Sequence, residues 1–399
     1  MSKKLESEVW DLDRCAGCGA CVATCAKRIV HYEDGEHPVK QKIVKTLGHT
    51  SKNLDVCHFC DMEGFNLCDL SCPRIKKEWS DGPVLKTTMI RTKAKVPSEE
   101  PNEVIAYLLA GAMQAGMIDG VIVSDVDPWT LEPYPKVATS ISQLIEAAGN
   151  QYIWSPTLEG LKEAIYKKGL KRLAVVGTPC VIQALQKMGE EDRNALNHIT
   201  RRIKLKVGLF CSGIYKVDAL KDISAALGVP VTKLQTIAVS QKGDKLKVTT
   251  YDGKTKDMKL SQVTKLIRKG CGRCYDLLSE QSDISIGPIG AKKGYSTVIV
   301  RTGAGQNVLD NAVRYSLLET KDGVDEKALK GAKESKQKRK QAEMIDELKI
   351  LMLEALRNPA KIDEAKAKFG EVYYKGAGPD NKDKEKPKGR SSCGTCSLC

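Results

Sequence analysis

Hydrophobic residues recur at helical and at strand spacing through the middle of this 399-residue chain. Residues 102–115 keep Val104 and Leu108 on one helical face and stop before Gly116, which predicts an amphipathic helix. Short apolar runs predict strands at 121–124, 173–176 and 205–210, and helical patterns follow at 181–188 and 217–227. Strands that alternate with helices are typical of an α/β sheet.

The pattern changes after the third of these strands. Two runs, 246–251 and 255–260, flank Asp252 and Gly253, which predicts a β-hairpin with a tight turn. The strongly charged stretch 325–372 keeps a helical repeat at Met344, Leu348, Leu351 and Leu356. Residues 375–392 are rich in Pro, Gly and Lys, so we interpret them as a flexible linker.

These patterns divide the chain into five parts. We predict a cysteine-rich domain at 1–75, a polar connection at 76–100, a mixed α/β domain at 101–320, a charged helical extension at 321–374 and a flexible basic tail at 375–399.

Composition narrows the classes of protein and partner. The net charge of +14 suits nucleic acid, an anionic membrane, a phosphorylated cofactor or an acidic protein. No nucleic-acid-binding motif and no membrane-length apolar run accompany this charge, so we expect no nucleic-acid partner and no direct membrane span. Fifteen cysteines in a chain without an apolar leader favour a cytoplasmic protein that uses its thiols for metal or redox chemistry.

Eight cysteines near the N-terminus have the spacing of a two-cluster [4Fe–4S] ferredoxin. The runs are Cys15-x2-Cys18-x2-Cys21-x3-Cys25 and Cys57-x2-Cys60-x7-Cys68-x3-Cys72-Pro73. In such domains the fourth cysteine of each run ligates the other cluster. We therefore expect one cubane on Cys15, Cys18, Cys21 and Cys72, and a second on Cys25, Cys57, Cys60 and Cys68. Structural zinc is the alternative, although zinc usually takes two CxxC pairs around one ion.

The remaining cysteines form two smaller groups. Cys180 opens a predicted helix, Cys211 follows a predicted strand, and Cys271 and Cys274 form a CxxC turn. These four cysteines are the number that one metal site needs, so they suggest a third site. The alternative is that Cys180 and Cys211 are buried as small apolar residues. The C-terminal Cys393, Cys396 and Cys399 lack a fourth ligand, so they take one from elsewhere or bind no fixed group.

Three stretches together resemble a known family. GTPCVIQALQ (177–186), GLFCSG (208–213) and the stretch from CGRC to GAG (271–305) are similar to the family of coenzyme F420 hydrogenase/dehydrogenase beta subunits. The resemblance covers about 101–320. A ferredoxin-like domain ahead of this module resembles the electron-input subunit of F420H2 dehydrogenases more than the beta subunit of formate dehydrogenases.

The resemblance implies a flavin-binding domain with FAD, one [4Fe–4S] cluster and a site for coenzyme F420 as substrate. Cys180, Cys211, Cys271 and Cys274 match the family's cluster cysteines, which brings the expected [4Fe–4S] clusters to three or more. The positions that match motifs near the flavin are Gly177, Thr178, Gly287, Gly290, Gly294, Tyr295, Ser296, Thr297 and Arg301. No catalytic side chain is expected, because the flavin mediates hydride transfer.

The sequence therefore favours a redox relay. We expect reduced F420 to give a hydride at FAD and single electrons to leave through the clusters to a membrane-associated or soluble redox complex. One alternative is the beta subunit of an F420-dependent hydrogenase or formate dehydrogenase, the latter with a molybdenum or tungsten catalytic subunit as partner. An alternative of another class is a non-enzymatic iron–sulfur carrier or adaptor.

Overall fold

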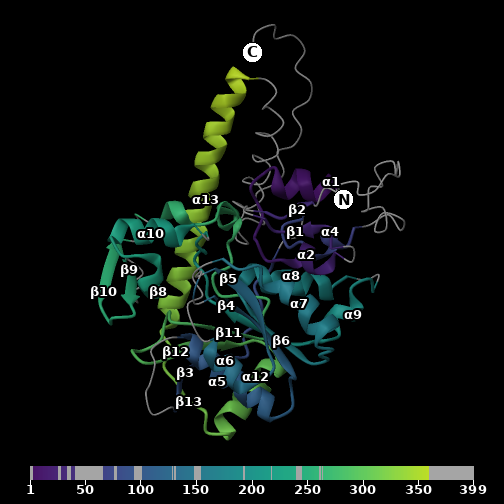
Figure 1. Ribbon diagram of the computed structural model, residues 1–399, viewed down its shortest axis with the longest axis vertical. Helices are drawn as coiled ribbons and strands as arrows, with labels where there is room; N and C mark the ends of the chain where they lie inside the picture. Colours follow the sequence, from purple (N-terminus) through teal and green to yellow (C-terminus); the bar gives the residue numbers. More distant parts are fainter. Residues whose placement is uncertain are drawn as a thin grey trace, which may run out of the picture. The chain divides into compact units, whose positions relative to one another are not determined.

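The computed structural model describes most of the chain (Figure 1), which divides into two units, 1–336 and 337–399. The described residues are 3–25, 28–33, 37–40, 66–75, 79–93, 101–127, 129, 132–147, 154–191, 194–216, 218–239, 245–259, 262 and 264–358. The predicted tail at 375–399 lies outside them, and so do Cys57, Cys60, Cys393, Cys396 and Cys399.

A mixed sheet of eight strands forms the centre of the first unit, in the order β13-β3-β12-β11-β7-β6-β4-β5. The strands are β3 (Lys86–Thr92), β4 (Gly120–Val126), β5 (Pro133–Ala138), β6 (Leu173–Gly177), β7 (Ile203–Leu209), β11 (Ile284–Gly287), β12 (Ser296–Val300) and β13 (Leu318–Lys321). Strands β4, β6, β7 and β11 run parallel, so their carboxyl ends share one edge of the sheet. The predicted mixed α/β fold and its three predicted strands are confirmed.

Helices cover both faces of this sheet because successive strand residues point to opposite sides. One face packs against α5 (Pro101–Gln114), α6 (Ile141–Glu146) and α12 (Gly303–Arg314), with Leu108, Val121 and Val207 in its core. The other face packs Ile122 and Val175 against α7 (Gly160–Lys162), α8 (Pro179–Gly189) and α9 (Asn197–Thr200). Figure 1 shows α5, α6 and α12 grouped together, apart from α7, α8 and α9. The predicted helices at 102–115 and 181–188 are confirmed.

The prediction that 76–100 is only a polar connection is wrong. This stretch contains β3, which lies inside the sheet between β13 and β12. Its sequence is KTTMIRT. Met89 and Ile90 are buried together with Thr88, and the charged Lys86 and Arg91 lie on either side of them. Too few apolar residues remain for a period-two pattern, so the burial of this strand comes from tertiary packing.

The N-terminal region is small and packs directly on the sheet domain. It contains α1 (Lys3–Leu5), the helical turn η1 (Glu6–Trp10), α2 (Ala20–Thr24), β1 (Val30–His31), β2 (Val39–Lys40) and α4 (Leu67–Ser71). Leu5, Val9 and Val22 form its own apolar cluster, but Ala20 and Ala23 belong to the same core as α8. The amide of Leu158 also donates to the Cys18 carbonyl at 3.0 Å.

Lys187 of α8 joins the two regions through the end of α4. Its Nζ donates to the carbonyls of Asp69, Cys72 and Ile75 at 2.9, 2.7 and 3.3 Å. Hydrogen bonds from a charged donor contribute about 1.5–3 kcal/mol, and a cation also suits the carboxyl end of a helix.

We expect Lys187→Met to lower the free energy of unfolding by about 2 kcal/mol, because it leaves these carbonyls without the ammonium. Urea unfolding followed by circular dichroism measures the change. The control is Lys221→Met, which removes an exposed lysine with a single 3.4 Å contact to Asp218 and should cost less than about 0.5 kcal/mol. Equal losses in the two variants would contradict a joining role for Lys187.

A smaller sheet and a long helix complete the described structure. Strands β8 (Leu234–Val239), β9 (Lys245–Thr250) and β10 (Thr255–Lys259) form an antiparallel sheet beside α10 (Ala219–Leu227). The β9–β10 turn, with Gly253 at φ +76°, confirms the predicted hairpin. Helix α13 (Glu326–Arg357) confirms the helical repeat beyond 325. Within the described ranges, no helix has the length and apolar character that crossing a membrane requires.

Candidate functional site

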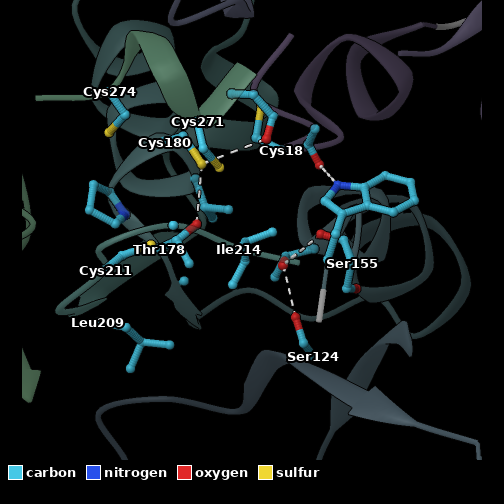
Figure 2. A pocket seen from close by; sticks show the side chains of 18 of the residues that line it. Cys18, Ser124, Ser155, Thr178, Cys180, Leu209, Cys211, Ile214, Cys271 and Cys274 are labelled. Atoms are coloured by element: carbon cyan, nitrogen blue, oxygen red, sulfur yellow. Dashed lines mark hydrogen bonds between the residues drawn. The ribbon is translucent and has the colours of Figure 1, made fainter. Parts of the chain in front are cut away.

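Four cysteines of the sheet domain line one pocket (Figure 2). Cys180 stands in the first turn of α8, directly after β6, and Cys211 follows β7. Because β6 and β7 are parallel neighbours, both thiols emerge at the same sheet edge. Cys271 and Cys274 reach this edge from the turn η6 (Lys269–Arg273). The pocket contains about 690 Å³ of atom-free space, part of it open to solvent.

A second pocket gathers four of the N-terminal cysteines. Cys15, Cys18, Cys21 and Cys72 line about 280 Å³ of space beside the apolar cluster of α2 and η1. These are the four that the spacing assigns to one cubane. Cys25 follows α2 and Cys68 lies in α4. Their two predicted co-ligands, Cys57 and Cys60, are outside the described residues, so that grouping stays a prediction.

The two pockets share one wall. Ala16, Gly17 and Cys18 line both, and the Cys180 Sγ lies 3.9 Å from the Ala16 carbonyl oxygen. Gly17 has a φ of +70°, and a Cβ on it would lie 2.2 Å from Nε1 of Trp154. Only glycine therefore fits there, and a single backbone segment separates the two groups of thiols.

Trp154 and Arg268 hold this wall from the side of the sheet domain. The Trp154 indole donates to the Gly17 carbonyl at 2.7 Å. The Arg268 guanidinium lies 4.4 Å from the centre of the Trp154 ring, and Tyr32 meets the same ring edge-on at 4.9 Å. A buried indole clamped in this way has little freedom to move.

Arg74 connects the two cysteine groups by another route. It follows Cys72 and Pro73, and its guanidinium donates to the carbonyls of Arg273 and Gly270 at 3.3 and 3.4 Å. It also lines the pocket of Cys180 and Cys274. One positive charge therefore faces thiols of both groups.

Burial and nearby positive charge shift the pKa values of these thiols in opposite directions. Burial raises the pKa of Cys180 and Cys72 to about 11 and that of Cys211 to about 12. Burial also acts to raise the pKa of Cys274, but the Lys336 ammonium and the Arg74 guanidinium outweigh it and hold that pKa below its ordinary value. Buried thiols of this kind need positive charge, from side chains or from metal, to exist as thiolates. Across the described part of the chain, no three Cys, His, Asp or Glu side chains group closely enough to hold a metal ion.

Two of the nine positions predicted to lie near the flavin reach the cysteine pocket. Gly177 ends β6 and Thr178 caps α8, and both line the pocket. The Thr178 hydroxyl lies 3.1 Å from the Cys180 Sγ, within hydrogen-bond distance. Both residues that lead from β6 into α8 therefore line the cysteine pocket.

The other seven positions lie away from this pocket, and their flavin contacts stay a prediction. Arg301 is buried and pairs with Glu280 at 2.9 Å. Tyr295 donates to Glu319 at 3.1 Å, and Arg91 lies 5.0 Å from its ring centre. The remaining five are Gly287 and Gly290, Gly294 with φ +80°, and the buried Ser296 and Thr297 of β12.

Sequence reasoning missed the hydroxyl-lined end of the cysteine pocket (Figure 2). Ser124 and Thr157 are hydrogen-bonded to each other at 3.0 Å. Within the described structure, the Ser155 Oγ is buried and has no hydrogen-bond partner. Ser124 ends a predicted strand, which was a usable signal, but nothing near 155 or 157 in the sequence indicates a site. The sequence likewise contains no local signal that Lys336 and Trp154 belong to this site.

Comparison with known proteins identifies the domain that carries this site. Residues 103–162 match the N-terminal model, and residues 170–326 the C-terminal model, of the coenzyme F420 hydrogenase/dehydrogenase beta subunit. Together the two matches span more than half of the chain. A chain of the F420-reducing [NiFe] hydrogenase complex from Methanosarcina barkeri superimposes with a TM-score of 0.60 and 26% identity, over 68% of this chain and 94% of that one.

Three relatives match a larger share of the chain. An uncharacterized protein of Methanocaldococcus jannaschii is 34% identical over 84% of this chain and 97% of its own length. The coenzyme F420-dependent sulfite reductase of the same organism is 27% identical over 84% of this chain, which spans only 50% of that protein. One of the subunits of the F420H2 dehydrogenase of Methanosarcina mazei is 27% identical over 76% of this chain and 84% of that protein. The chain therefore belongs to the family of coenzyme F420 hydrogenase/dehydrogenase beta subunits, which are components of oxidoreductases.

Proposed function

We propose that this chain is an electron-transfer subunit that exchanges hydride with coenzyme F420 at FAD and single electrons with a partner complex through [4Fe–4S] clusters. The observation that carries the proposal is the wall shared by two pockets, each of which contains the four cysteines predicted to hold one cubane. Groups bound on either side of Ala16, Gly17 and Cys18 would be separated by one stretch of backbone. Such a separation suits transfer of single electrons from one group to the next.

The cysteines fit the clusters in number and origin. Cys180, Cys211, Cys271 and Cys274 would hold one cubane, and Cys15, Cys18, Cys21 and Cys72 another. Arg74 and Arg268 stand between the two sites and offset the negative charge of the thiolates. The spacing of Cys25, Cys57, Cys60 and Cys68 supports a further cluster.

The hydroxyl-lined end of the cysteine pocket fits a flavin. Ser155 offers a buried hydroxyl that no protein group uses among the described residues, and Leu209 and Ile214 offer apolar contact. FAD bound there would supply the conversion between a hydride and two single electrons. Ser155 and Thr178 would orient the flavin beside Cys180.

The flavin is tested by absorption spectroscopy of anaerobically purified protein and by Ser155→Val. We expect a flavin spectrum in the wild type and at least about tenfold weaker flavin binding in the variant, because valine removes the free hydroxyl and fills its space. The control is Ser142→Val on the exposed side of α6, which should leave binding unchanged. A wild-type protein with iron and sulfide but no flavin would favour the alternative of a non-enzymatic carrier.

The direction of electron flow and the partner are inferred from similarity. The F420H2 dehydrogenase component matches this chain over most of both lengths, which supports oxidation of reduced F420 as the physiological direction. The F420-dependent sulfite reductase matches over half of its own length, so an acceptor of that class is the second candidate. Affinity purification from the native host distinguishes the two, and a molybdenum or tungsten protein in the complex would favour the formate dehydrogenase alternative.

A further inference from the structure

We propose that Lys336 is a fixed positive charge that raises the reduction potential of the cluster held by Cys180, Cys211, Cys271 and Cys274. This inference rests on the proposed function, since it takes that site as a [4Fe–4S] centre. It goes further by naming a side chain outside the cysteine motifs that determines how electrons are distributed between neighbouring centres.

Lys336 reaches the cysteine pocket from α13, a helix that carries none of its cysteines. The side chain is 3% exposed, and its Nζ lies 2.6 Å from the Cys211 carbonyl, 2.7 Å from the Asp276 carbonyl and 3.7 Å from the Cys274 Sγ. An ammonium has three N–H groups, and the pocket supplies one acceptor for each. The geometry therefore matches the charged form of the lysine, which ties together two loops that carry ligands.

The charge of Lys336 acts on one cysteine pocket and not on both. Arg74 and Arg268 lie between the two groups of thiols, so their charges act on both. Lys336 lines the pocket of Cys274 and is absent from the lining of the N-terminal pocket. Lys336 therefore adds a positive charge at the pocket of Cys274, as Lys187, which donates to the Cys72 carbonyl at 2.7 Å, adds one at a cysteine of the N-terminal pocket.

Positive charge beside a cluster stabilises its reduced form. Reduction adds one negative charge, and both the ammonium and its hydrogen bond to the Cys274 sulfur favour that added charge. Burial strengthens the effect because little water screens the lysine. The cluster beside Lys336 should then be easier to reduce than the same cluster without this lysine.

Lys333 provides a matched control one helical turn earlier. Its Nζ pairs with Asp81 at 2.7 Å and with Glu280 at 2.9 Å. These carboxylates neutralise it, and Lys333 does not line the cysteine pocket. Removing its charge changes the same helix without removing a charge from the thiols.

The test is a redox titration of the anaerobically purified full-length protein, followed by electron paramagnetic resonance, for wild type, Lys336→Gln, Lys336→Arg and Lys333→Gln. We expect Lys336→Gln to lower the midpoint potential of one cluster by at least 59 mV, which is a tenfold change in how an electron is divided between that cluster and an unchanged neighbour. Lys336→Arg keeps the charge and should stay close to wild type. Lys333→Gln should leave every midpoint unchanged.

Iron and acid-labile sulfide content, measured on the same samples, separates the possible failures. Full iron with an unchanged midpoint in Lys336→Gln would overturn the role of Lys336 and leave the proposed function intact. Loss of the cluster in Lys336→Gln but not in Lys336→Arg would support a requirement for the positive charge at this position. Loss of the cluster in both variants would overturn the role of the charge, because it would show that the site needs the shape of the lysine side chain. A wild-type protein without any cluster signal would instead overturn the proposed function.

Discussion

Replacing Cys180 with serine should remove one cluster and slow electron delivery from reduced F420 to a one-electron dye by at least about 100-fold. Loss of groups that merely support metal ligands costs about 10–100-fold, so loss of a ligand should cost no less. Cys180 is also the proposed ligand beside the shared wall, with its Sγ 3.9 Å from the Ala16 carbonyl. Its replacement therefore affects the step between the two centres.

Two measurements make this prediction specific to electron exit. Iron content should fall by about four atoms per chain, the content of one cubane. Reduction of a bound flavin by F420H2 in a single turnover should persist, because the proposed relay places the flavin before this cluster. The control Met188→Leu changes a buried residue of the same helix at nearly constant volume and should alter neither quantity. Full iron content and an unchanged dye rate in Cys180→Ser would contradict the assignment of this ligand.

Replacing Gly17 with alanine should destabilise the protein by about 3 kcal/mol and reduce the iron content of both pockets. Part of the cost is conformational, since a φ of +70° costs an L-residue about 1–2 kcal/mol. The rest is steric, because the new Cβ would lie 2.2 Å from the Trp154 Nε1. Trp154 cannot easily retreat, since Arg268 and Tyr32 contact its ring and its indole donates to the Gly17 carbonyl. Overpacking of this kind typically costs about 1–3 kcal/mol.

Gly116→Ala separates the two contributions to this cost. Gly116 has a nearly identical φ of +65°, but nothing lies within 4 Å of the position its Cβ would occupy. Urea unfolding of Gly116→Ala should therefore show only the conformational cost of about 1–2 kcal/mol and full iron content. If the two alanine variants lose the same stability and keep the same iron, the shared wall is not tightly packed.

The sequence predicted the elements whose apolar residues form continuous runs with clear ends. The strand at 173–176 is uniformly apolar and ends at Gly177 before a helix, and its place in the sheet explains why Cys180 and Cys211 meet. Strand β3 was missed because Lys86 and Arg91 interrupt its pattern, although Met89 and Ile90 are buried. The local pattern of apolar residues indicates which secondary structure a segment can form. Whether a segment of mixed charged and apolar residues is buried depends on residues far away in the sequence.

The same division holds for the site. Cysteine spacing assigned Cys15, Cys18, Cys21 and Cys72 to one group, because the fourth cysteine of each run ligates the other cluster, and these four line one pocket. Ser155 reaches the pocket through tertiary packing, without a local signal. Lys336 is one of many lysines on the charged helix α13, and no periodicity distinguishes the one that is buried. A lone side chain from a distant element is the kind of component that sequence reasoning does not find.

The position of Lys336 in the chain has a consequence for how the protein matures. All four thiols of its pocket leave the ribosome before this lysine, which then bonds to the loops that carry Cys211 and Cys274. Until α13 forms, those loops lack this clamp, so a cluster inserted early in synthesis would bind loops that Lys336 does not yet hold together.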